Sequence, residues 1–334
     1  MLFSWTPKRL TALSRRRYSV EMKITQRITA MNLRVLTSWI CLVGVVPFLT
    51  GCGRSPALAG EALDKPAAPS TPSENMRYEV EIKHDLTYYD GADADKIKHK
   101  LDLYLPKGKT DFPVVMFVHG GGWVFGDKIF FGIYEGVGKM FARHGIGAVV
   151  TNYRLSPGVR HPEHIKDVAR AFAWTYKHIA DYGGRTDDLF LCGHSAGGHL
   201  VSLLATDESY LKAEGLSLKN VKAVMPISGV YGIPDNLFNE VFGKDPVERK
   251  NAGPINHVHG GCPPFFIVYA DHDFPYCDAM SEEFCKALKA KGVSAETLKI
   301  TDRNHINIIG KTTKDDDPCA KALLEFVGER QAKK

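Results

Sequence analysis

The sequence Gly-His-Ser-Ala-Gly at residues 193–197 is the strongest candidate for chemistry in this 334-residue chain. It directly follows the apolar run Leu189–Cys192 and precedes a run with helical periodicity. A serine on a tight turn between a strand and a helix has a strained backbone, and small residues on either side let the two elements approach each other. The pattern predicts a nucleophilic Ser195, with the Ala196 N–H at the start of the helix able to donate to a developing oxyanion.

A second glycine-rich turn also follows a predicted strand. His119 is followed by three glycines, residues 120–122, and then by Trp123, directly after the apolar run Val114–Val118. Consecutive glycines let backbone N–H groups approach a ligand without obstruction by Cβ atoms. A flexible turn explains such a run equally well when it stands alone. The two motifs together, each after an apolar strand, favour a role in chemistry.

The segments that position these motifs alternate between strand-like and helix-like patterns from Met76 onward, which predicts one domain with a mostly parallel sheet covered on both faces. Outer antiparallel strands are predicted from apolar–polar alternation at 78–83 and 100–105. Interior parallel strands are predicted from the apolar runs at 113–118, 146–152, 189–192, 221–227 and 264–270. A further strand is predicted at 295–300. Helices are predicted at 164–182, 198–205, 278–291 and 318–329.

The motifs and their order resemble those of the α/β-hydrolases, close to the carboxylesterase branch that includes hormone-sensitive-lipase-like, feruloyl-esterase-like and kynurenine-formamidase-like enzymes. The resemblance covers residues 101–326. It implies the α/β-hydrolase fold, with a mostly parallel eight-stranded sheet, helices on both faces and a small or minimal cap. The segments that carry it are Leu-Asp-Leu-Tyr-Leu-Pro at 101–106, His-Gly-Gly-Gly-Trp at 119–123, Tyr-Arg-Leu-Ser-Pro at 153–157, Gly-His-Ser-Ala-Gly-Gly at 193–198 and Arg-Asn-His at 303–305.

The same resemblance implies an oxyanion hole formed by the N–H groups of Gly121, Gly122 and Ala196. It also implies that the catalytic residues occur in the order nucleophile, acid, base, and that neither a cofactor nor a metal ion takes part. No cysteine or histidine spacing in the chain resembles a zinc site.

That order selects the partners of Ser195. Asp271 and Asp273 both follow the predicted strand at 264–270, and the family pattern Gly-x-x-Asp falls on residues 270–273, which favours Asp273 although residue 270 is Ala. The loop after the last predicted strand contains His305, which fits the base. The implied catalytic residues are Ser195, Asp273 and His305.

Three neighbouring side chains are candidates for substrate binding: Trp123, His194 and Phe274. Core packing is the commoner explanation for the two aromatic residues, and packing or hydrogen bonding for the histidine. We expect His119 to brace the glycine turn.

The first 51 residues have the pattern of a signal peptide. Eight basic residues and one acidic residue accompany an apolar stretch of 15 residues, Val35–Leu49. The ending Leu49–Cys52 resembles the lipobox of bacterial lipoproteins, which predicts a lipid on Cys52 and an exported protein of the cell envelope. One alternative is a plain secretory leader, which would leave a secreted or periplasmic protein, and another is an uncleaved anchor. Translation can also start at Met31. Residues 52–75, rich in Pro, Ala and Ser, predict a tether before a catalytic domain at 76–334.

Charge argues against a nucleic-acid partner. The whole chain carries a formal charge of +5, but residues 52–334 hold 35 basic and 37 acidic residues. The excess of positive charge therefore lies in the leader and gives no basic surface on the domain. We expect contact with a membrane only through the lipid anchor, and the sequence does not fix the oligomeric state.

Export permits disulfide bonds. Cys192 lies in an apolar run and is predicted to be a buried free thiol. The other domain cysteines allow two bridges in any of three pairings; they are Cys262, Cys277, Cys285 and Cys319.

The sequence thus predicts a serine carboxylic ester hydrolase for small or medium esters, such as acetyl or feruloyl side chains of polysaccharides. The roughly thirty residues between Gly229 and Cys262 are enough for a small cap but not for an extensive lid. The alternatives are an amidase of the kynurenine formamidase type and a non-catalytic binding protein with a hydrolase fold.

Overall fold

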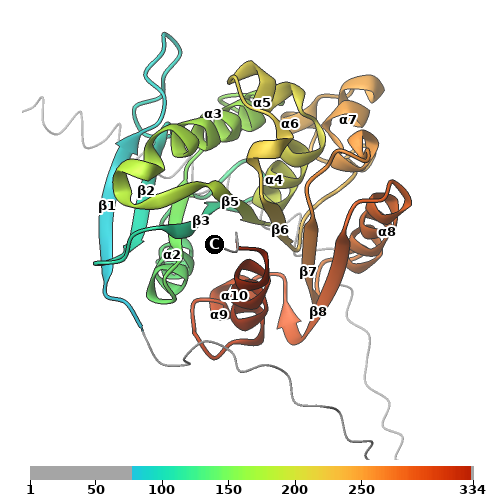
Figure 1. Ribbon diagram of the computed structural model, residues 1–334. Coiled ribbons are helices and arrows are strands. Elements are labelled where there is room, and N and C mark those ends of the chain that lie inside the picture. The colour runs from blue at the N-terminus through green and yellow to red at the C-terminus, as the bar shows by residue number, and fades with distance from the viewer. Residues whose placement is uncertain (1–76, 332–334) are drawn as a thin grey trace, which may run out of the picture. The chain divides into compact units, whose positions relative to one another are not determined.

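The computed structural model describes residues 77–331, in which eight strands form one sheet (Figure 1). Their order across the sheet is β1-β2-β4-β3-β5-β6-β7-β8. Strand β2 runs antiparallel to both of its neighbours, and every other neighbouring pair is parallel. The strands are β1 (Val80–Thr87), β2 (Lys100–Pro106), β3 (Phe112–Val118), β4 (Gly147–Thr151), β5 (Gly184–His194), β6 (Ala223–Ile227), β7 (Phe265–His272) and β8 (Ala295–Asn304).

Helices cover both faces of the sheet, so the predicted α/β-hydrolase architecture is confirmed (Figure 1). Helices α3, α4 and α8 bury their apolar residues on one face, and α2, α9 and α10 on the other. Successive residues of β3 serve the two cores alternately, as a pleated strand requires. The helices are α2 (Ile133–Arg143), α3 (Glu163–His178), α4 (Ala196–Thr206), α5 (Ser209–Ala213), α6 (Asn239–Phe242), α7 (Pro246–Ala252), α8 (Cys277–Ala290), α9 (Asn307–Lys311) and α10 (Pro318–Arg330), with 3₁₀ turns η1 (Ile179–Tyr182), η2 (Leu218–Asn220) and η3 (Pro254–His257).

The chain between β6 and β7 forms the small cap and contains only the short elements α6, α7 and η3. Its loops are held by the buried guanidinium of Arg249, which donates to the carbonyl oxygens of Leu237 (2.6 Å) and Gly243 (2.7 Å) and to Asn239 Oδ1 (3.1 Å). Because one buried cation satisfies several loop carbonyls, the cap keeps a defined shape without long helices.

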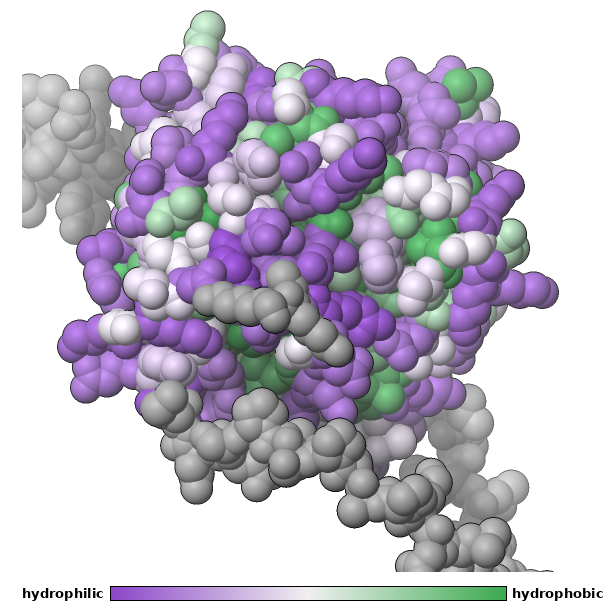
Figure 2. Space-filling view, viewed as in Figure 1, coloured by the Kyte–Doolittle hydropathy of each residue, from purple (hydrophilic) through white to green (hydrophobic). Residues whose placement is uncertain are grey.

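The molecular surface seen from the direction of Figure 1 is mainly hydrophilic. On the described part of this face, hydrophobic residues form small separate areas (Figure 2). None of the helices within residues 77–331 is long and apolar enough to cross a membrane.

Disulfide bonds, which the sequence allows, are absent among the described cysteines: all five are buried free thiols. Cys277 and Cys285 are eight residues apart on α8, which separates them by about 12 Å along the helix axis, beyond the reach of a disulfide. Cys319 packs in the core on the opposite face of the sheet from Cys262 and Cys285. The predicted leader, Cys52 and the tether lie outside the described residues.

Candidate active site

Ser195 occupies the turn between β5 and α4 with φ 56° and ψ −118°, a conformation that L-residues rarely adopt. The turn is possible because its flanking glycines have no side chains. A Cβ on Gly193 would lie 2.5 Å from the Gly197 carbonyl oxygen, and one on Gly197 would lie 2.0 Å from the Val118 carbonyl oxygen. The sequence pattern therefore does form the strained strand-to-helix turn that it predicts.

The structure brings together the three residues named from the sequence, at the carboxyl ends of β5, β7 and β8. His305 Nε2 lies 2.9 Å from Ser195 Oγ, and His305 Nδ1 lies 2.6 Å from Asp273 Oδ1. His305 is buried at 7% exposure, whereas Ser195 is partly exposed. A base that contacts both the hydroxyl and an orienting carboxylate is the arrangement that activates a serine nucleophile.

The Asp273 carboxylate accepts hydrogen bonds from several sides. Its Oδ2 accepts from the Ser228 hydroxyl and the Ala270 N–H, and its Oδ1 accepts from the Phe274 N–H as well as from His305. Burial acts to raise the pKa of Asp273, but the hydrogen bond and charge of His305 and the bond from Ser228 outweigh it and lower this pKa to about 2. Asp273 therefore stays ionised at neutral pH.

Asp271, the competing acid, has a different task. Its carboxylate accepts the backbone N–H groups of Asp302 (2.9 Å) and Arg303 (3.0 Å), and so ties the end of β7 to the end of β8. It helps to position the loop that carries His305 and makes no contact with the imidazole in the described structure.

The glycine turn presents backbone N–H groups next to this centre. Gly121 and Gly122 have φ of 118° and 58°, and a Cβ on Gly121 would lie 2.0 Å from the Phe125 carbonyl oxygen. Within residues 77–331, the N–H groups of Gly121, Gly122 and Ala196 have no hydrogen-bond acceptor. Ala196 is the first residue of α4, where an N–H has no acceptor inside the helix.

His119 braces this turn, as expected. Its Nδ1 donates to the Gly120 carbonyl oxygen (2.7 Å), and its ring stacks on Tyr153 with centroids 4.4 Å apart. Burial lowers the pKa of His119 to about 4, so the ring is neutral at pH 7.

A chain of hydrogen bonds joins the glycine turn to the loop of His305. The Gly120 N–H donates to the Tyr134 hydroxyl (3.0 Å), which lies 3.3 Å from His194 Nδ1, and His194 Nε2 donates to the His305 carbonyl oxygen (2.8 Å). Burial lowers the pKa of His194 to about 3. His194 is thus placed to hold the backbone of His305.

The other two candidate substrate-binding residues lie at different depths. Trp123 is buried, with its indole N–H 3.3 Å from His199 Nδ1 and its ring in edge contact with Phe238 and Phe242 of the cap region. Phe274 is 39% exposed, and its ring centroid lies 4.0 Å from that of His305. Phe274 therefore offers a partly exposed surface beside the His305 ring, while Trp123 supports the cap.

Two residues of the site carried no signal in the sequence. Tyr134 lies on the buried face of α2 like an ordinary core aromatic residue, and Ser228 follows a strand as an ordinary small polar residue. Their roles depend on contacts with residues more than ten positions away, which sequence spacing does not reveal.

A strained serine between a strand and a helix, contacted by a histidine and an aspartate at the carboxyl edge of this sheet, defines an α/β-hydrolase. Solved structures with the same fold include a truncated carbohydrate esterase from gut microbiota (TM-score 0.66, 20% identity, 78% of this chain and 99% of that one). Esterase B from Lactobacillus rhamnosis is also similar (TM-score 0.63, 22% identity, 77% of this chain and 87% of that one).

The chain belongs to the BD-FAE family, whose model matches residues 101–288. It is 29% identical over 282 residues to esterase LipQ of Mycobacterium tuberculosis, covering 78% of this chain and 65% of that protein. It is 25% identical over 242 residues to the kynurenine formamidase of Danio rerio, covering 69% of this chain and 78% of that protein. The match spans less than two thirds of several relatives, for example half of a probable isoprenylcysteine methylesterase of Arabidopsis thaliana.

Proposed function

We propose that the protein is a serine carboxylic ester hydrolase in which Ser195 Oγ attacks the acyl carbonyl carbon. The observation that carries the proposal is the pair of contacts of His305, 2.9 Å to Ser195 Oγ and 2.6 Å to Asp273 Oδ1. Relatives named as esterases support the same class of reaction.

The residues divide the proton transfers in a simple way. His305 Nε2 takes the proton from Ser195 Oγ as the ester carbonyl is attacked, and it returns that proton to the leaving alcohol oxygen. Water then attacks the acyl-enzyme, again with His305 as base, and releases the acid and the free serine. Asp273, ionised at neutral pH, fixes the Nδ1–H tautomer and stabilises the imidazolium.

Negative charge on the attacked carbonyl oxygen needs fixed donors. The N–H groups of Gly121, Gly122 and Ala196 lack other acceptors among the described residues and serve as the oxyanion hole. Removing one such donor typically lowers kcat by about 100- to 1,000-fold. His119 and Tyr134 contribute indirectly because they fix the backbone of this turn.

The test is hydrolysis of p-nitrophenyl acetate, butyrate and octanoate by the full chain and two serine variants. Ser195→Ala removes the proposed nucleophile, whereas Ser202→Ala removes a buried hydroxyl two turns further along α4 that donates a hydrogen bond to the Gly198 carbonyl oxygen. Loss of turnover in the first variant alone supports the proposal. The preferred length of the acyl group indicates the size of the acyl pocket. Equal rates in Ser195→Ala and wild type contradict it.

For the substrate we propose small or medium esters, including acyl groups on carbohydrates. The small cap argues against emulsified fats, and a structural neighbour is named a carbohydrate esterase. The second candidate is an amidase, since the chain matches 78% of the length of a kynurenine formamidase. Rates with acetylated xylan and with N-formylkynurenine, compared at equal enzyme concentration, separate the two.

We also propose that the domain is anchored to the cell envelope through a lipid on Cys52. The support is the sequence alone: a basic segment, an apolar stretch of 15 residues and the ending Leu49–Cys52. Radiolabelled palmitate added to a bacterial expression host is expected to label the wild-type chain and not Cys52→Ala. Equal labelling of both chains contradicts the anchor.

A further inference from the structure

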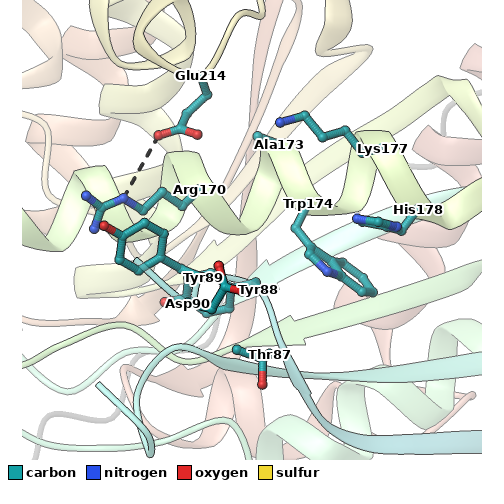
Figure 3. Close-up of a pocket in the computed structure, with 10 residues that line it drawn as sticks. All are labelled: Thr87, Tyr88, Tyr89, Asp90, Arg170, Ala173, Trp174, Lys177, His178 and Glu214. Carbon is teal, nitrogen blue, oxygen red and sulfur yellow. Dashed lines mark ion pairs between the residues drawn. The ribbon is translucent and has the colours of Figure 1, made fainter. Parts of the chain in front are cut away.

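A concave site lies between the end of β1 and α3, and Ser195 is not among the residues that line it (Figure 3). Its cavity volume is about 510 Å³, within the range of small-ligand pockets. Strand β1 lies four strands from β5 in the sheet, which at ~4.8 Å per strand is a lateral separation of about 19 Å. The cavity is therefore separate from the candidate active site.

One wall of this cavity is formed by Tyr89 and Arg170, and nearby carboxylates compensate the positive charge of Arg170. The Arg170 guanidinium lies 3.9 Å from the centre of the Tyr89 ring and forms ion pairs with Asp167 (3.2 Å), Asp93 (3.8 Å) and Glu214 (4.0 Å). Figure 3 draws the pair of Arg170 and Glu214 at the rim. Because these carboxylates compensate Arg170, the wall provides shape more than charge.

Three further lining residues, Trp174 and Lys177 further along α3 and Asp90 next to Tyr89, have no polar partner elsewhere in the described structure. Trp174 and Lys177 are neighbours on the last turns of α3, and Asp90 follows β1. Within residues 77–331, the Trp174 indole N–H has no acceptor, and the exposed side chains of Lys177 and Asp90 have no ion-pair partner. Trp174 is partly exposed and lines the cavity, with the ring of His178 4.8 Å away.

This combination indicates the chemistry of the ligand. A partly exposed indole favours a ligand with an apolar C–H face, while an ammonium, a carboxylate and an indole N–H suit hydroxyl groups, which both donate and accept. The two cationic lining residues, Arg170 and Lys177, are matched in formal charge by two anionic ones, Asp90 and Glu214, so the cavity has no net charge that would select an anionic or a cationic ligand. We infer that it is an accessory binding site for a neutral saccharide chain.

The biological purpose of this site rests on the proposed function, whereas its saccharide binding can be measured without that function. If the substrate is an ester on a polysaccharide, a second hold on the same chain raises the effective concentration of its ester groups near Ser195. The site should then lower KM for polymeric substrates and leave small esters unaffected.

The first experiment measures binding to the full chain carrying Ser195→Ala, which leaves saccharides unmodified. Isothermal titration calorimetry uses xylohexaose, mannohexaose and cellohexaose, with a hexagalacturonate as the anionic comparison. We expect at least one neutral hexasaccharide to bind. Adding Trp174→Ala should weaken that binding at least about tenfold, whereas Tyr176→Ala, which changes an aromatic residue of α3 outside the cavity, should not.

The second experiment compares turnover by the chain with native Ser195. Trp174→Ala is expected to raise KM for acetylated xylan about tenfold with an unchanged rate on p-nitrophenyl acetate, which also reports correct folding. Failure of all neutral hexasaccharides to bind, binding that Trp174→Ala leaves intact, or tighter binding of the uronate overturns the accessory site. Absence of ester hydrolysis overturns the proposed function instead, and the calorimetry still decides the binding site.

Discussion

Tyr134→Phe removes one hydroxyl from the middle of the series of hydrogen bonds that joins the glycine turn to His305. The Tyr134 oxygen accepts from the buried Gly120 N–H at 3.0 Å and lies 3.3 Å from His194 Nδ1. Without it, a buried N–H loses its acceptor and His194 loses one of its two polar contacts. A buried donor without a partner costs about 1–3 kcal/mol of unfolding free energy.

The catalytic effect follows from the same geometry. This series of hydrogen bonds holds the glycine turn at one end and the His305 backbone at the other. In the variant, both the proposed oxyanion donors and the proposed base therefore become less well fixed. A misplacement near 1 Å at a reacting group lowers rates by about 100-fold, and partial loosening is expected to lower kcat by about 10- to 100-fold. KM should change less, since Tyr134 is buried away from the substrate.

The assay pairs this variant with Tyr104→Phe. Tyr104 is buried in the same apolar core, and its hydroxyl takes no part in the hydrogen bonds that join the glycine turn to His305. Urea unfolding and p-nitrophenyl acetate kinetics should show a loss of stability and of kcat for Tyr134→Phe and little change for Tyr104→Phe. Equal behaviour of the two variants refutes the argument that the hydroxyl of Tyr134 organises the site.

Three further results are expected. Gly197→Ala places a Cβ 2.0 Å from the Val118 carbonyl oxygen, so it should abolish ester hydrolysis and lower the thermal midpoint, whereas wild-type activity in a folded variant contradicts the packing of the turn. Ser228→Ala removes a hydrogen bond to Asp273 and should lower kcat/KM about tenfold; an unchanged value shows that the bond does not orient the carboxylate. Burial lowers the pKa of His119 and His194 to about 4 and 3, so below pH ~6.5 the unfolded chain binds protons that the native state does not. The free energy of unfolding should therefore fall by about 1.4 kcal/mol per pH unit for each ring between pH 6.5 and 4, and a urea midpoint at pH 5 equal to that at pH 7 contradicts their burial as neutral groups.

Much of the fold followed from sequence because its strong signals are local. Buried parallel strands are nearly continuous apolar runs, and β3, β4, β6 and β7 lie within two residues of the predicted bounds. The prediction for β5 began at Leu189 although the strand begins at Gly184, because its first residues are polar and lie outside the apolar run. Helix α2 was not predicted, although its apolar residues recur at helical spacing; it also contains two residues of low helix propensity, Gly136 and Gly138. A Cβ on Gly138 would lie 2.5 Å from the Tyr104 ring, so tertiary packing selects glycine there.

In the candidate site, too, local motifs were predictable from the sequence and long-range contacts were not. Ser195, Asp273 and His305 were named from motifs, and the structure brings their side chains together. The contacts that orient them were not predictable, because Ser228 reaches Asp273 across 45 positions and His194 reaches His305 across 111. The same applies to the cysteines: counting them does not show that the sheet separates Cys319 from Cys262 and Cys285, or that Cys277 and Cys285 lie about two turns apart on α8.

The most direct test of the account is intact-mass and peptide mass spectrometry after reaction with a fluorophosphonate. The account predicts a single phosphonyl adduct on Ser195 and loss of ester hydrolysis in proportion to labelling, with no adduct on Ser195→Ala. An adduct on another residue that accompanies the loss of activity, or full labelling of Ser195 with undiminished hydrolysis, contradicts the claim that Ser195 is the nucleophile.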